Sequence, residues 1–87
     1  MEELIEKLNK QKTISHSEVE ISILNDIANR IKIGHYTWVK LRLKSLQETM
    51  ELNEDREGVT ESLREAWEIR EYHLKSTVKE LTRLGVL

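Results

Sequence analysis

Three histidines and a series of glutamates are the side chains of this chain whose types suit metal binding or acid–base chemistry. His16, His35 and His73 are far apart, and none has a second histidine on the next turn, the spacing that places two imidazoles on one helix face. Cysteine is absent, which excludes disulfides, zinc-thiolate sites and thiol catalysis. The sequence therefore predicts no metal site and no cofactor.

Glutamates alternate with arginines in the last third of the chain, a pattern typical of a solvated helix face. Glu71, for example, precedes Lys75 by four residues, so the two can pair on successive turns. The sequence contains no G-x-S-x-G motif, no phosphate-binding glycine-rich loop and no H-E-x-x-H motif. We therefore expect a protein that is not an enzyme and has no small-molecule substrate.

The charge distribution carries the strongest functional signal, because a basic centre lies between acidic flanks. No acidic residue occurs from Ile27 to Gln47. Residues 1–26 contain six acids against three lysines, and residues 48–87 contain ten acids against six lysines and arginines. Such a layout indicates an anionic partner for the middle of the chain. The candidate binding residues there are Arg30, Lys32, His35, Tyr36, Trp38, Lys40, Arg42 and Lys44.

Two kinds of partner suit this basic centre. The cations of residues 30–44 would pair with phosphates, and Tyr36 or Trp38 would stack on a base, so nucleic acid is one candidate. An acidic protein surface is the other. The turn at Gly34 does not follow the helix-turn-helix pattern, because Arg30 stands where a small residue is expected.

A seven-residue repeat in the last third of the chain is a second functional signal. It has two series, Leu63–Arg70–Thr77–Leu84 and Trp67–Leu74–Leu81. Heptads are typical of helices that associate, and a polar residue on the stripe can set the register. We predict that Trp67, Leu74 and Leu81 are buried, within a bundle or across a homodimer. The alternative for Arg70 is a monomeric bundle in which it reaches the solvent edge. The candidate interface residues are Leu63, Trp67, Arg70, Leu74 and Leu81.

Helices must position these side chains, because the chain has no proline, three glycines and 34% charged residues. Apolar residues recur at helical spacing in four segments. Capping boxes at Ser15/Glu18 and Ser17/Glu20 signal the second segment, Gly34 is a C-terminal cap, and Thr60 or Gly58 caps the fourth. The predicted helices are roughly Glu2–Gln11, Ser17–Ile33, Thr37–Leu52 and Val59–Leu84, joined by Lys12–Ile14, Gly34 and Asn53–Gly58.

Strict alternation of apolar and polar residues in Val19–Ile23 and Val39–Lys44 is a strand signal that conflicts with this assignment. A hairpin over Ile31–Val39 is the resulting alternative. We favour helices, because both alternating stretches continue into longer patterns with a period of 3.6. The predicted fold is a single all-α domain over residues 1–87, a small bundle of three to four helices with a long C-terminal helix.

These observations together predict a non-enzymatic helical interaction or assembly module. It would act by self-association or by docking on a larger complex, and a protein partner or homodimer is expected. The alternative is a small nucleic-acid-binding protein that uses the basic corner at 30–44. No apolar run is long enough to cross a bilayer and the N-terminus is acidic, so we expect a soluble cytoplasmic protein without membrane contact.

Overall fold

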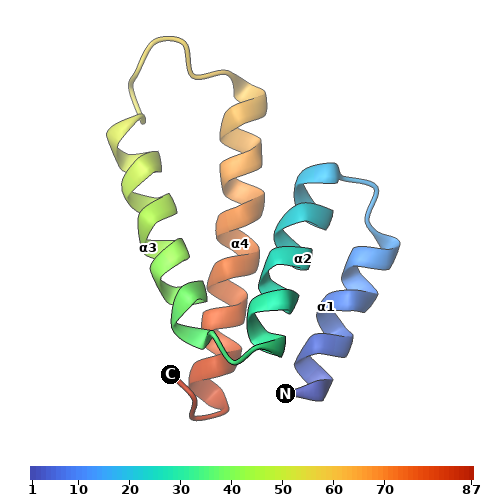
Figure 1. Cartoon of the computed structure of the whole chain (residues 1–87). Helices are drawn as coiled ribbons and strands as arrows, with labels where there is room; N and C mark the ends of the chain where they lie inside the picture. Colours follow the sequence, from blue (N-terminus) through green and yellow to red (C-terminus); the bar gives the residue numbers. More distant parts are fainter.

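The structure is a computed structural model that describes all residues from Met1 to Leu87. Its elements are four α-helices: α1 (Glu2–Ile14), α2 (Glu18–Lys32), α3 (Tyr36–Leu52) and α4 (Glu61–Arg83) (Figure 1). The predicted all-α fold with a long C-terminal helix is confirmed. The hairpin alternative over residues 31–39 is wrong, because these residues form the end of α2, a tight turn and the start of α3.

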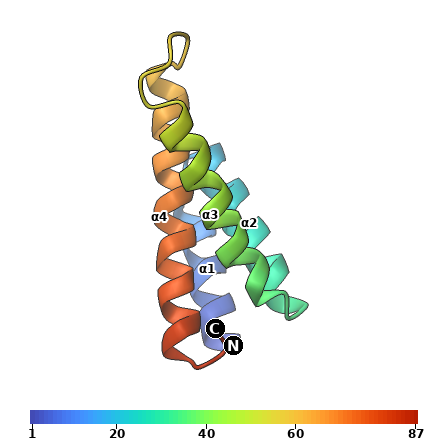
Figure 2. The same cartoon turned by 90° about the vertical axis from the view of Figure 1, so that its left-hand side faces the viewer.

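The four helices form two hairpins, α1–α2 and α3–α4, and α2 also packs against α3 and α4. The α3–α4 hairpin extends beyond the α1–α2 hairpin, and the α2–α3 turn lies at the opposite end of the molecule (Figures 1 and 2). The principal extents are 42 × 28 × 18 Å. The radius of gyration of 13.5 Å exceeds the roughly 12 Å of a compact domain of this length. The molecule is therefore elongated and flat.

The first helix is one turn longer than predicted, because Lys12–Ile14, expected as a connector, forms its end. Thr13 Oγ1 donates a hydrogen bond to the Asn9 carbonyl (2.9 Å), and the Ser15 N–H donates to the Gln11 carbonyl (3.1 Å). These local bonds continue the helix in the absence of a glycine or proline.

None of the four helices has an apolar stretch long enough to cross a membrane.

The cap of α2 follows the prediction only in part. Ser17 Oγ accepts from the Glu20 N–H (3.3 Å), as a capping box requires. The N–H of Ser17, however, donates to Ser15 Oγ (3.2 Å) rather than to a carboxylate. The Glu20 carboxylate is therefore free for another partner. At α4 the two possible caps are resolved in favour of Thr60, whose Oγ1 accepts from the Leu63 N–H (3.1 Å).

Gly34 makes the sharp α2–α3 turn possible. Its φ of +79° lies in the left-handed region that favours glycine. The Gly34 N–H donates to the Ile31 carbonyl (3.1 Å) and the His35 N–H donates to the Arg30 carbonyl (2.9 Å). This pair of bonds is a Schellman motif. It ends α2 and holds His35, the N-cap residue of α3, against the last turn of α2.

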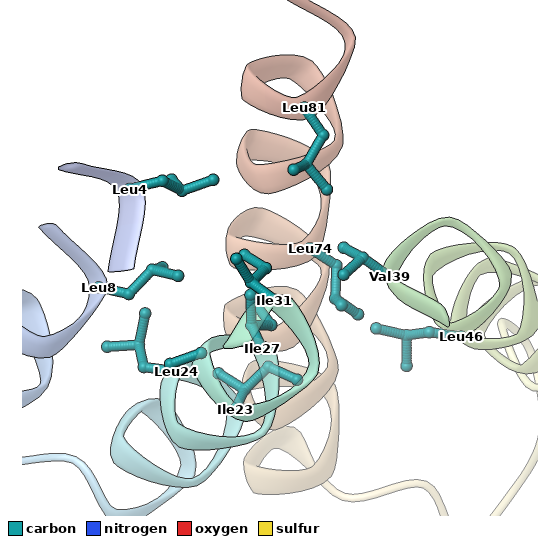
Figure 3. Close-up of a cluster of buried hydrophobic side chains, with 11 residues drawn as sticks. Leu4, Leu8, Ile23, Leu24, Ile27, Ile31, Val39, Leu46, Leu74 and Leu81 are labelled. Atoms are coloured by element: carbon teal, nitrogen blue, oxygen red, sulfur yellow. The ribbon is translucent and has the colours of Figure 1, made fainter. Parts of the chain in front are cut away.

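Eleven buried apolar residues from all four helices form one core (Figure 3). Leu74 and Leu81 have no exposed surface, so the predicted burial is confirmed for two of the three heptad residues. Trp67, the third, is only half-buried and packs at the edge of the core. Thr77 is buried as well, and its hydroxyl donates to the His73 carbonyl one turn earlier (2.7 Å). That bond explains how a polar residue is tolerated on the apolar stripe.

One side-chain hydrogen bond links α4 to α2 across the core edge. The buried His73 lies with Nε2 3.0 Å from Oε2 of Glu20, whose side chain is 33% exposed. Hydrogen bonds from the Ser15 hydroxyl and from His73 lower the pKa of the Glu20 carboxyl below its usual value, and burial opposes this effect. Since the folded-state pKa is the lower one, the ionised carboxylate stabilises the fold.

We expect the stabilisation by the Glu20 carboxylate to be lost at low pH. It is complete above the unfolded-state pKa of about 4.3 and is lost as the pH falls through the lower folded-state value. Glu20→Gln should therefore lower the free energy of unfolding at pH 6, and its difference from the parent should be smaller at pH 3. Urea denaturation at the two pH values measures this. Glu57→Gln, in the α3–α4 loop, is the control that should show no such difference; a constant effect of Glu20→Gln would contradict the assignment.

Candidate interaction site

The strongest candidate site is a patch at the α2–α3 corner, which we call the corner patch. The Gly34 turn brings the last turn of α2 beside the first turns of α3, and an open depression of about 500 Å³ lies between them. Arg30, Lys32, Ile33 and Trp38 line this depression, together with Asp26 and Asn29. Leu41 and Arg42 extend the face of Trp38 along α3, since they follow it by three and four residues. The corner patch thus consists of Arg30, Lys32, Ile33, Trp38, Leu41 and Arg42.

Trp38 and Arg30 form the centre of the corner patch. The Arg30 guanidinium carbon lies 5.0 Å from the centroid of the Trp38 ring, within range of a cation–π contact. Arg30 Nη1 also lies 3.5 Å from Nδ1 of His35, the exposed residue that precedes α3. Trp38 is half-buried and packs against the core. The aromatic ring is therefore held by the fold while part of it faces the depression.

The binding residues predicted from the sequence did not include two exposed apolar side chains beside Trp38. Ile33 is 63% exposed and Leu41 is 65% exposed. The spacing of Leu41 from Trp38 was a usable signal, because residues three apart share a helix face. Ile33 carried no clear signal, since its exposure depends on how the chain turns at Gly34. Basic side chains that border these apolar groups are typical of a surface for an acidic and partly apolar partner.

The structure does not bring all predicted basic residues to one surface. Lys40 and Lys44 are exposed, and at 100° per residue they project from α3 more than about 100° away from Trp38. Arg42 shares the side of Trp38 instead. Tyr36 is half-buried and packs against the core, so its ring does not offer a free face for stacking. The predicted basic corner is therefore divided into the corner patch and a separate Lys40–Lys44 pair.

The predicted interface residues of α4 are divided as well. Leu74 and Leu81 lie inside the core, so they are covered by the chain itself. Leu63 is 39% exposed, and Trp67 and Arg70 are half-buried. These three residues lie in the half of α4 nearest the α3–α4 loop, where they remain accessible. Their role in an interface stays a prediction.

We call residues 48–68 the arm; they comprise the end of α3, the loop and the start of α4. The arm contains eight acidic residues against two arginines. Both arginines are engaged locally, because Arg56 Nη1 donates to Asn53 Oδ1 (3.4 Å) and Arg64 Nη2 donates to the Glu54 carbonyl (2.6 Å). The close contacts of carboxylates with basic side chains, His73–Glu20 and Arg83–Glu80, include no residue of the arm or the corner patch.

A larger hollow of about 760 Å³ lies between the start of α1 and the end of α4. Its lining is mostly charged and includes Glu80 and Arg83, which pair with each other at 2.8 Å. This hollow thus contains an internal ion pair, whereas no cation of the corner patch forms an ion pair within the chain. The corner patch is the better candidate for binding.

Comparisons of the chain with models of protein families, with curated proteins and with solved structures find no match. The function proposed below therefore rests on the residues and geometry of this chain.

Proposed function

We propose that this protein is a non-enzymatic helical interaction module whose corner patch docks an acidic protein surface that presents an aliphatic side chain. The observation that supports this most is the half-buried Trp38 flanked by the exposed Ile33 and Leu41. An aromatic ring that is fixed by packing and flanked by apolar side chains is typical of the hot spots at protein interfaces.

Charge supports the same kind of partner. Arg30, Lys32 and Arg42 surround the apolar centre, and Asp26 is the one acid that lines the depression. Cations at the rim of an interface favour encounter with an acidic surface and discriminate against basic ones. The apolar centre would supply affinity, and the basic rim would supply orientation and selectivity.

Nucleic acid is the second candidate, favoured by the five lysines and arginines in the acid-free window. Phosphates would bind Lys32 and Arg42, and replacement of one contacting cation would lower the salt slope by about one. The Lys40–Lys44 pair lies on another side of α3, and one face of the Trp38 ring is occupied by Arg30. These two features favour the protein partner.

Titrations with three probes test the proposal. The first is a labelled helical peptide with leucines on one face and glutamates elsewhere, and the second is the same peptide with serines in place of leucines. The third is a set of single- and double-stranded oligonucleotides at about 50 mM salt. We expect the leucine peptide to bind with micromolar affinity and the serine peptide, at equal charge, to bind at least about tenfold more weakly.

The oligonucleotides decide between the two candidates. Nonspecific nucleic-acid binders usually show dissociation constants of about 10⁻⁴–10⁻⁶ M at physiological salt, so protein at about 100 μM suffices at the lower salt. Binding of oligonucleotides without discrimination between the two peptides would favour the nucleic-acid function. Equal, negligible binding of all probes would overturn the proposed docking function.

A further inference from the structure

We propose that the partner docked by the corner patch is the arm of a second copy of this chain, in a head-to-tail contact. This inference rests on the proposed function and names its partner. The corner patch has three cations, Arg30, Lys32 and Arg42, against one acid, Asp26, in the lining of its depression, and the arm has a net charge of −6. The two surfaces are therefore complementary in charge.

The charged residues of α3 do not lie where they would stabilise that helix. A helix is stabilised by acids near its N-terminus and by bases near its C-terminus. The other three helices follow this rule, whereas α3 has no acid in its first turn and no base in its last. Its basic residues lie toward the corner, and its acids Glu48 and Glu51 lie toward the arm. This order leaves opposite charges at the two ends of α3, as a contact between copies requires.

The arm presents the aliphatic group that the proposed partner requires. Leu52, at the end of α3, is 82% exposed, more than any other large apolar side chain. Glu48 lies one turn before it on the same face of α3, and Glu51 precedes it directly, so this leucine belongs to an acidic part of the chain. Insertion of Leu52 into the depression beside Ile33 and Trp38 would bring the acidic arm toward Lys32 and Arg42.

The shape of the molecule determines what such a contact would build. The corner and the tip of the arm lie at opposite ends of an elongated molecule, whose longest extent is 42 Å (Figures 1 and 2). A chain therefore does not reach its own corner with its own arm. Because the two surfaces differ, the contact is heterologous, and each added copy leaves one free corner and one free arm. The expected product is a concentration-dependent series of oligomers.

A pair of matched variants tests this assembly by sedimentation velocity. The corner variant carries Leu41→Ser and Arg42→Gln, and the arm variant carries Glu51→Gln and Leu52→Ser. Each loses one exposed leucine and one charge, and neither gains a charge of opposite sign. Circular dichroism and thermal melting verify that both remain folded. We expect each variant alone to be monomeric where the parent forms dimers and larger species.

The mixture of the two variants gives the decisive result. The intact arm of the corner variant should dock on the intact corner of the arm variant, which yields a one-to-one heterodimer that grows no further. A mixture that stays monomeric, or a parent that stops at a symmetric dimer, would overturn the head-to-tail contact. A parent that is monomeric up to about 1 mM but binds the leucine peptide would overturn this inference alone. A parent that does neither would overturn the proposed function as well.

Discussion

Replacement of Leu74 by alanine is expected to lower the free energy of unfolding by about 2–5 kcal/mol. Leu74 has no exposed surface and lies in the cluster that joins α4 to residues such as Ile31 and Val39 (Figure 3). Its removal would leave a cavity lined by several helices. Only 13 of the 87 residues are buried, so the loss is a large fraction of the roughly 5–15 kcal/mol of a typical domain.

Urea denaturation and thermal melting, both followed by circular dichroism, measure this effect. Leu41→Ala is the matched control, because the same substitution at a side chain that is 65% exposed removes little buried surface. We expect the control to melt close to the parent protein. If Leu74→Ala also melted within a degree or two of the parent, Leu74 would not lie in the core.

Replacement of Trp38 by alanine is expected to weaken binding of the leucine–glutamate peptide by at least about 30-fold. Truncation of an interface hot spot costs about 2 kcal/mol or more, and each 1.4 kcal/mol corresponds to a factor of ten. Trp38 packs against the core, contacts the Arg30 guanidinium and lines the depression. Its loss would remove the apolar centre and release Arg30 from its position.

Trp67→Ala is the control for this measurement. Trp67 is also half-buried at the edge of the core, but it lies in the arm rather than at the corner. Both variants should lose some stability, whereas only Trp38→Ala should lose affinity for the peptide. Fluorescence anisotropy of the labelled peptide, at a temperature where both variants are folded, separates the two effects. An equal loss of affinity in both variants would mean that binding depends on general stability.

The sequence by itself determined the helices and most of their ends. Gly34 was identified as a cap, and Thr60 as one of two candidates, because each acts through hydrogen bonds that span only a few residues. Leu74 and Leu81 were assigned to the core by their spacing, since a helix places residues seven apart on one face. These features follow from the local geometry of the backbone, which the residue types disclose directly.

The tertiary structure alone decided which of these faces are covered and which side chains meet. His73 pairs with Glu20, which lies 53 residues away in the sequence, and no local pattern indicates that pairing. The heptad predicted equal burial for Trp67 and Leu74, yet α2 covers only part of α4, so Trp67 stays half-exposed. Burial depends on how helices that are distant in the sequence pack against each other. The periodicity within one helix does not specify how much of its length a neighbouring helix covers.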